Sequence, residues 1–259
     1  MVHLEMIESD KKNPWLLFIH GFGGSHQMWN KQVNIYKDKF NICLVDLPGH
    51  AGIELTKKSL ESANIFKDVA KSIVEQIRAY GIQKITTISV SLGTLINYFM
   101  LKYDSDLIDE AVLSGAICGT TVGYKTIMKS VELLKNIVPY KILIKMCCNV
   151  LMPKKSHKKS RRYLLKEALK MNKKEFVFWY TNLVQKLDSM TENTLTSIAT
   201  KKIHLISGDE DYVFLKKMKT FAKNNEVPLK IIKDCGHVCS LHKWREFNTY
   251  LDTFVLQKA

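Results

Sequence analysis

The stretch KITTISVSLGTLINYF, Lys84–Phe99, changes its pattern at its centre. Its first half is an apolar, β-branched run without alternation, which predicts a strand that is buried on both faces. Its second half carries apolar residues at helical spacing, so only Ser91, Leu92 and Gly93 separate the two patterns. A serine at such a junction lies at the carboxyl edge of a sheet and beside a helix N-terminus, where developing negative charge is stabilised. Ser91 is therefore a candidate nucleophile.

The same alternation of strand and helix extends over most of the 259 residues. Helical patterns separate the strands, as in the apolar stripe from Phe66 to Tyr80, and further helices are expected from about Val213 and around Phe247–Phe254. The pattern predicts an α/β fold: a mostly parallel, doubly wound sheet with helices on both faces. The other predicted strands are Trp15–His20, Asn41–Leu47, Glu110–Gly115, Ile203–Ser207 and Leu229–Ile232.

The alternation stops between residues 119 and 199, where helices broken at Pro139 and Pro153 are expected. We interpret this stretch as an all-helical cap inserted into a core made of residues 1–118 and 200–259. Its apolar residues recur at helical spacing and are expected to cover the carboxyl edge of the sheet and to contact a ligand there. These residues are Ile127, Val131, Leu134, Ile142, Leu143, Met146, Phe176, Trp179 and Leu183.

The net charge of +14 is concentrated in the segment Pro153–Lys174, whose only acidic residue is Glu167. Such a segment is either a solvated face or a surface that attracts an anionic substrate group or an anionic membrane. No nucleic-acid-binding motif accompanies it, so a nucleic-acid partner is not expected.

The spacing of the cysteines indicates whether disulfides or a metal site are expected, and the first residues and the lengths of the apolar runs bear on cellular localisation. The six cysteines lack the dense spacing of a disulfide scaffold, and CGHVC, Cys235–Cys239, does not match a zinc motif, so reduced thiols and no metal are expected. The start MVHLEMIESDKK has no apolar signal-peptide core, and no run reaches the roughly 18 apolar residues of a membrane span. A cytoplasmic protein is expected.

Three motifs carry a resemblance to the α/β-hydrolase family. SVSLG, Ser89–Gly93, resembles its G-x-S-x-G nucleophile elbow, with Ser89 in place of the first glycine. HGFGGSHQMW, His20–Trp29, resembles its His-Gly loop, and VDLPGHAG, Val45–Gly52, is similar to its D-x-P-G-H-G turn. The resemblance implies the α/β-hydrolase fold with Ser91 as nucleophile. Because the family has a longer N-terminal hairpin, a sheet short of the usual eight strands is expected.

The resemblance also implies an oxyanion hole. The backbone N–H groups of Phe22 and Leu92 would donate to the oxyanion, and His20, Gly21 and Gly23 would form the supporting loop.

A serine hydroxyl needs an imidazole to take its proton and a carboxylate to orient that imidazole. In the family the three follow in the order Ser, acid, His. His237 in DCGHV matches the family position, whereas His242 is expected inside the last helix. Asp211 in SGDEDYVF matches the family acid, with Asp209 and Glu210 as competitors.

Other candidates receive structural interpretations. His20 and His50 are expected to hold their loops by hydrogen bonds. Asp46, at the carboxyl end of a predicted strand, is an alternative acid, but a structural role is favoured for it.

These residues together imply a serine hydrolase that acts on carboxylic esters or thioesters without a cofactor, with an apolar acyl group as substrate. Two alternatives stay open. The motifs are also similar to the menaquinone-pathway synthase and carbon–carbon hydrolase branches, which bind acidic substrates with cap residues, for which Arg161 and Arg162 are candidates. The other alternative is a ligand receptor with slow or no hydrolysis.

Overall fold

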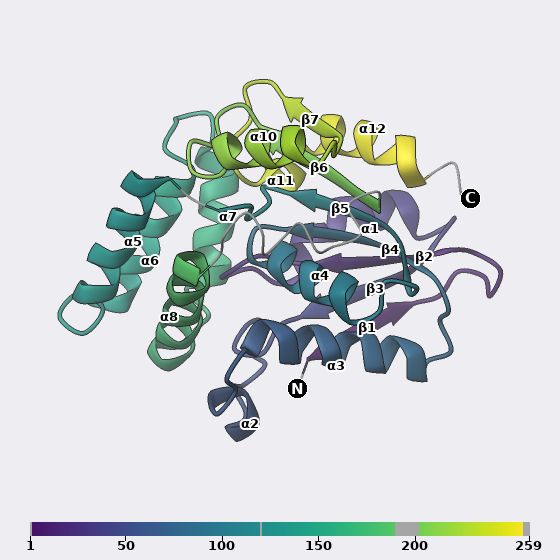
Figure 1. Ribbon diagram of the computed structural model, residues 1–259, viewed down its shortest axis with the longest axis horizontal. Helices are drawn as coiled ribbons and strands as arrows, with labels where there is room; N and C mark the ends of the chain where they lie inside the picture. The colour runs from purple at the N-terminus through teal and green to yellow at the C-terminus, as the bar shows by residue number, and fades with distance from the viewer. Residues whose placement is uncertain (1, 120, 190–201, 256–259) are drawn as a thin grey trace.

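Seven strands form one sheet in the computed structural model, which describes residues 2–119, 121–189 and 202–255 (Figure 1). Their order across the sheet is β1-β3-β2-β4-β5-β6-β7, and every neighbouring pair is parallel except β1 with β3. The predicted fold class is confirmed, and within the described residues the sheet has one strand fewer than eight, as expected. The strands are β1 (His3–Ile7), β2 (Trp15–Ile19), β3 (Asn41–Asp46), β4 (Ile85–Val90), β5 (Ile108–Ser114), β6 (Ile203–Gly208) and β7 (Leu229–Ile232).

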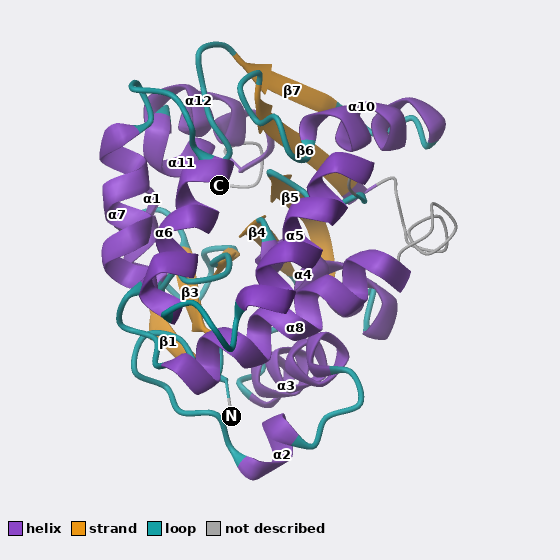
Figure 2. Ribbon diagram, turned by 90° about the vertical axis from the view of Figure 1, so that its left-hand side faces the viewer, coloured by secondary structure: helices purple, strands orange, loops and turns teal. Residues whose placement is uncertain are grey.

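Helices cover both faces of the sheet (Figure 2). Strand β2 shows why, because successive side chains point to opposite faces: Leu17 and Ile19 pack into one core, and Leu16 and Phe18 into the other. The first core is covered by α3 (Ile65–Ala79), α4 (Leu92–Tyr103) and α10 (Leu215–Asn224). The second is covered by α1 (Asn30–Tyr36), α11 (Cys239–His242) and α12 (Trp244–Val255). Two further short helices of the described core are η1 (His26–Trp29) and α2 (Lys57–Leu60).

The strand order reverses between β2 and β4. Strand β3 follows β2 in sequence but lies on its far side, whereas β4 pairs with β2 in parallel, with Ile19 opposite Ser89. The loops that leave the carboxyl ends of β2 and β4 therefore turn to opposite faces and leave a crevice between them. This crevice is where the His20–Trp29 and Ser91 segments meet.

Among the described residues, four helices lie between β5 and β6 in sequence: α5 (Val122–Leu134), α6 (Tyr140–Leu151), α7 (Lys158–Ala168) and α8 (Lys173–Ser189). They lie together beyond one end of the strands (Figures 1 and 2). The expected breaks occur: Pro139 precedes α6, and Pro153 lies between α6 and α7. We call residues 121–189 the helical insertion; the predicted boundary at 199 and 200 lies outside the described residues. No described helix combines the length and the apolar character that crossing a membrane requires.

The sequence-based expectation that the apolar residues of the insertion are covered is wrong for some of them. The side chains of Val131, Leu143, Phe176, Trp179 and Leu183 are buried. In contrast, the relative exposures of Ile127, Leu134, Ile142 and Met146 are 44%, 36%, 50% and 43%. The reason is geometric, because α5 and α6 each bury one face against the rest of the protein and carry apolar residues on the other as well.

Two smaller expectations are also corrected. Tyr80, placed on the buried stripe of α3, is 50% exposed because it lies at the C-cap, beyond the last turn. His242 lies in the short helix α11, before the last helix and not inside it.

Candidate active site

Ser91 occupies the tight turn between β4 and α4. Its φ of 53° and ψ of −120° lie in a strained region for a residue other than glycine. Ser91 is the N-cap of α4, yet its side chain makes no capping hydrogen bond, and its backbone carbonyl accepts from the Thr94 amide and hydroxyl. The Ser91 hydroxyl is thus held at the carboxyl edge of the sheet and is left available for chemistry.

The departure from glycine at Ser89 has a structural explanation. The Ser89 side chain is fully buried, and its Oγ accepts a hydrogen bond from Asn97 Nδ2 at 3.2 Å, which also donates to Thr87 Oγ1. Asn97 on α4 therefore satisfies the hydroxyl that glycine would not bring. The second glycine of the motif is indispensable, because a Cβ on Gly93 would lie 2.6 Å from the carbonyl oxygen of His20.

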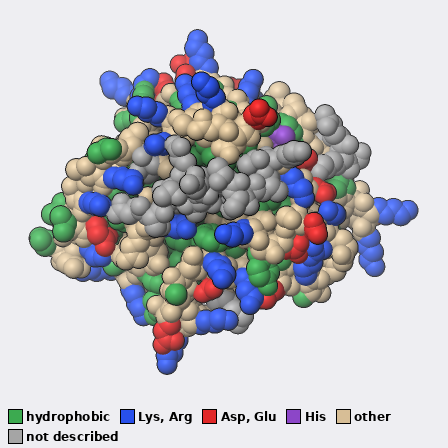
Figure 3. Space-filling model, viewed as in Figure 1, with side chains coloured by type: hydrophobic (Ala, Val, Ile, Leu, Met, Phe, Trp, Pro, Cys, Tyr) green, Lys and Arg blue, Asp and Glu red, His purple; other side chains and the backbone are tan. Residues whose placement is uncertain are grey.

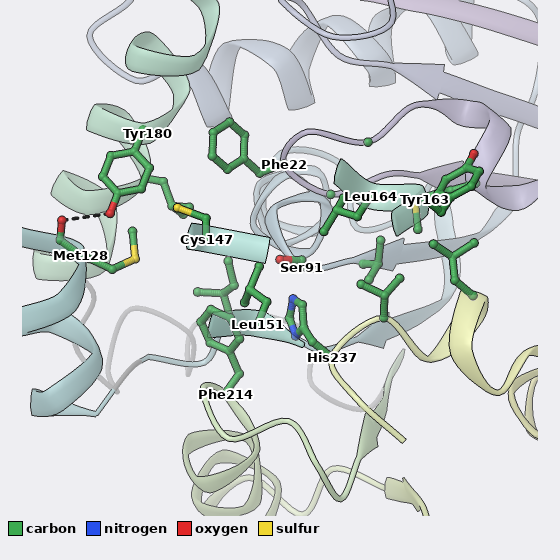
Figure 4. Close-up of a pocket in the computed structure, with 18 of the residues that line it drawn as sticks. Phe22, Ser91, Met128, Cys147, Leu151, Tyr163, Leu164, Tyr180, Phe214 and His237 are labelled. Carbon is green, nitrogen blue, oxygen red and sulfur yellow. Dashed lines mark hydrogen bonds between the residues drawn. The ribbon is translucent and has the colours of Figure 1, made fainter. Parts of the chain in front are cut away.

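His237 and Asp211 are brought together from separate loops. His237 Nδ1 lies 2.8 Å from Asp211 Oδ2, and both side chains are buried. The other oxygen of Asp211 accepts from the amides of Val213 and Phe214, which orients the carboxylate. His237 Nε2 is buried and has no hydrogen-bond partner among the described residues. Figure 4 shows the side chains of His237 and Ser91 facing one another.

The competing carboxylates are engaged elsewhere. Asp209 Oδ1 accepts from the amide of Cys235 at 3.2 Å, and Glu210 binds Lys154 and His157 of the helical insertion. The hydrogen bond from Lys154, assisted by that from His157, lowers the pKa of the Glu210 carboxyl. Among the three neighbouring acids, the structure brings Asp211 to His237.

The loop after β2 approaches Ser91 closely. A Cβ on Gly21 would lie 3.1 Å from the Cβ of Ser91, and one on Gly23 would lie 2.8 Å from the Cβ of Ala168. His20 braces this loop, since its Nδ1 donates to the Gly21 carbonyl at 2.8 Å and its Nε2 accepts from the Leu47 amide at 3.1 Å. Burial lowers the pKa of His20, consistent with this neutral imidazole.

The expectation that His20 holds its loop by hydrogen bonds thus agrees with its contacts. His50 is also buried, and its Nδ1 bonds to the Pro48 carbonyl in its own turn. Asp46 accepts from the backbone amide and the ring of His26 and has a structural role.

Ser91 and His237 line an apolar cavity beneath the helical insertion (Figure 4). Its volume is about 60 Å³, well below the roughly 300 Å³ of small ligand sites. Within the described part of the chain, the cavity lining contains no lysine, arginine, aspartate or glutamate. Helices α5 to α8 contribute Tyr124, Met128, Cys147, Leu151, Tyr163, Leu164, Tyr180 and Leu183.

Two arginines and a cysteine of the helical insertion provide neither a cation nor a nucleophile to this cavity. Arg161 donates to the carbonyls of Met152 and Lys154, and with Arg162 it lines a separate outer groove. Burial raises the pKa of the Cys147 thiol to about 12, so it stays protonated and is not a competing nucleophile.

Gly115 is a site residue that sequence reasoning missed. It follows β5 with φ of +52°, and a Cβ there would lie 2.8 Å from the Cε1 and Nδ1 atoms of His237. The only signal in the sequence was its position at the end of a predicted strand. The Phe214 ring also packs against the imidazole, with centroids 5.2 Å apart. These two contacts, with Asp211, hold the ring in place.

Gly115→Ala is expected to lower kcat by about 100-fold, because the new methyl group displaces the imidazole from Ser91. Steady-state kinetics on an ester substrate measure the change. Gly81→Ala is the matched control, since Gly81 has φ of +91° and open space around its Cβ position. Both variants incur backbone strain, but the control is expected to keep its activity. Equal kcat values in the two variants would contradict the role given to Gly115.

His157 is a second missed residue, and it links the helical insertion to the loops of both Asp211 and His237. Its fully buried ring has Nε2 2.6 Å from Glu210 Oε2, and its ring atoms would lie 2.9 Å from a Cβ on Gly236. The Glu210 amide in turn donates to the Cys235 carbonyl at 2.9 Å. His157 therefore packs where the acid loop and the histidine loop meet.

His157→Phe keeps the ring but removes the hydrogen bond to Glu210, and kcat is expected to fall about tenfold because the two loops lose their common anchor. Lys154→Ala is the control, because Lys154 binds the same carboxylate from the surface. Kinetics and thermal unfolding of both variants are the measurements. A loss of stability in His157→Phe without a change in kcat would show that the contact only supports the fold.

Comparisons with known proteins agree with this architecture. The family model of the alpha/beta hydrolase fold matches residues 14–137. Among solved structures, an esterase from Exiguobacterium antarcticum superposes with a TM-score of 0.79 at 14% identity, covering 98% of this chain and 95% of that one. An enol-lactonase from Burkholderia xenovorans LB400 gives a TM-score of 0.79 at 13% identity over 98% and 96% of the two chains. These likenesses show the fold.

A curated relative matches in sequence over a shorter stretch. It is a 2-succinyl-6-hydroxy-2,4-cyclohexadiene-1-carboxylate synthase of Escherichia coli O7:K1, 32% identical over 80 residues. The match takes in 31% of this chain and 29% of the length of that synthase.

Proposed function

Since this chain has the α/β-hydrolase fold, we propose that it is a serine hydrolase that cleaves carboxylic esters or thioesters with Ser91, His237 and Asp211. One observation carries the proposal. His237 is bound to Asp211 through Nδ1 and presents a buried, unpartnered Nε2 on the side of Ser91. A buried polar atom without a partner is costly, so its position beside a free hydroxyl supports a role in proton transfer.

In the proposed reaction, Ser91 Oγ attacks the acyl carbon while His237 Nε2 accepts the hydroxyl proton. Asp211 stabilises the resulting imidazolium. The tetrahedral oxyanion lies toward the amides of Phe22 and Leu92; Leu92 is the first residue of α4, and such amides have no acceptor within the helix. The proton then passes from His237 to the departing alcohol or thiol. A water molecule, deprotonated by His237, releases the acid from Ser91.

The apolar lining of the cavity supports an acyl group without charge. Its small volume favours short acyl chains unless the helical insertion moves. The insertion is thus proposed to act as a cap on the acyl site.

The synthase chemistry of the curated relative is the second candidate, supported by the sequence match. The compound in the name of that relative carries a carboxylate and a succinyl group. Such anionic groups require cationic partners, and none of the described residues lining the cavity is lysine or arginine. Ester hydrolysis is therefore the better fit. A ligand receptor with slow or no hydrolysis would share the fold but would give no turnover.

Labelling with a fluorophosphonate probe tests the nucleophile, and p-nitrophenyl esters of increasing acyl length test the reaction. The adduct is expected on Ser91 and not on Ser89, which fragment masses distinguish within one peptide. Short esters are expected to turn over fastest. Labelling without turnover of any ester would favour the synthase or receptor function, and the absence of labelling would remove Ser91 as nucleophile.

A further inference from the structure

The helical insertion carries an exposed apolar surface at the turn between α5 and α6. The relative exposures of Leu133 and Ile137 are 79% and 80%, and those of Ile142 and Met146 are 50% and 43%. Clusters of large apolar side chains with such exposure are uncommon on protein surfaces. A cluster of this kind with a polar rim is typical of an interaction site. We call Leu133, Leu134, Ile137, Ile142 and Met146 the apolar tip.

Cationic residues of α6 border the apolar tip. Lys141 and Lys145 are exposed and alternate along α6 with Ile142 and Met146, at the spacing that places each pair on one face. The opposite face of α6 contributes Cys147 and Leu151 to the catalytic cavity. Helix α6 is therefore bound to the protein on one side and presents a mixed apolar and cationic stripe on the other.

A groove of about 270 Å³ continues this surface from α6 onto α7. It is lined by cationic and uncharged residues, and no carboxylate is among those described there. Figure 3 shows hydrophobic side chains beside Lys and Arg at the left-hand end, where α5 and α6 lie. The groove residues are Lys145, Cys148, Asn149, Lys158, Arg161, Arg162 and Leu165.

The charge of the insertion indicates what this surface binds. Residues 121–189 contain 16 Lys and Arg and four Asp and Glu, which amounts to an excess of 12 positive charges in a chain whose net charge is +14. A second copy of the chain would place this surface against an equally cationic one, because a two-fold interface pairs a patch with itself. Nucleic acid would meet the cations but leave the aliphatic tip exposed. An anionic lipid surface offers negative headgroups to the lysines and an acyl boundary to the tip.

We propose that the apolar tip and the adjoining cationic groove dock the protein onto an anionic membrane surface. The tip enters the headgroup region while Lys141, Lys145 and the groove residues contact anionic headgroups. The inference is independent of the reaction at Ser91, because it rests on the outer faces of α5, α6 and α7.

Co-sedimentation with vesicles tests the docking. The full chain is expected to bind vesicles of phosphatidylcholine mixed with phosphatidylserine at least about tenfold more strongly than phosphatidylcholine alone, and high salt is expected to release it. Lys141→Glu with Lys145→Glu, and separately Leu133→Asp with Ile137→Asp, are each expected to weaken binding by at least about tenfold.

Matched controls keep the test specific. Lys216→Glu with Lys219→Glu reverses two exposed lysines on α10, and Ile35→Asp changes a half-exposed aliphatic side chain on α1. Both are expected to bind as the unchanged chain does, and circular dichroism verifies that every variant is folded.

Any of the following results would overturn the proposal: no binding to anionic vesicles, equal loss in the control and tip variants, or a stable dimer that the tip variants dissociate without any vesicle binding. Retention on duplex DNA without binding to vesicles would overturn it as well.

Discussion

Replacing Ser91 with alanine is expected to lower kcat for ester hydrolysis by about 10⁴- to 10⁶-fold. The substitution removes the nucleophile, and binding and the oxyanion donors alone leave a small residual rate. The folded state should tolerate the change, because the Ser91 side chain makes no capping hydrogen bond in its turn. Kinetics on a p-nitrophenyl ester, with unfolding measured in parallel, separate the two effects.

Two further variants sharpen this result. Ser89→Ala is the control two residues away, and it is expected to keep most of the activity although it loses the hydrogen bond from Asn97. Ser91→Gly is expected to raise the free energy of unfolding by about 1 kcal/mol, because glycine accepts φ of 53° without strain. If Ser91→Ala retained hydrolysis within tenfold of the unchanged enzyme, the proposed reaction would be wrong.

Asp211→Asn is expected to lower kcat by about 10³- to 10⁴-fold with little loss of structure. The contacts of Asp211 predict how the amide would lie. Its oxygen would keep accepting from the amides of Val213 and Phe214, so its NH₂ group would face His237 Nδ1. Nδ1 then becomes the acceptor and Nε2 carries the proton, which leaves no base for Ser91.

The adjacent carboxylate provides the control for Asp211. Glu210→Gln removes a negative charge one residue away but leaves the contact between Asp211 and His237 intact. Its effect on kcat is expected to be no more than about tenfold. Comparable losses in the two variants would contradict the assignment of Asp211 as the catalytic acid.

Much of the fold follows from local patterns. Non-alternating apolar runs indicated strands buried on both faces, and the strands from Trp15 to Ile232 occur where they were expected. Periodicity reports which residues share a face, but not whether anything packs against that face. For this reason the exposed Ile142 and Met146 were predicted as covered.

The candidate site was predictable where chain order and short motifs carry information. Ser91 and the loop at His20 follow neighbouring strands. The match to the family motifs indicated His237 and favoured Asp211, but it left Asp209 and Glu210 as competing acids. The positions that hold the imidazole were not predictable, because Gly115 and Phe214 come from other loops and contact His237 only in the folded chain. Likewise, the Ser89 hydroxyl is satisfied by a hydrogen bond from Asn97, which joins α4 to β4 and which no motif encodes.

The amino-acid sequence by itself determined the alternation of strand and helix, the abrupt turn at Ser91 and the excess of positive charge between residues 119 and 199. These are properties of neighbours along the chain. Only the tertiary structure decided which of three successive carboxylates meets His237, and which apolar faces of the insertion stay exposed. Both depend on contacts between segments far apart in sequence, and the free energy of those contacts comes from packing that local pattern does not specify.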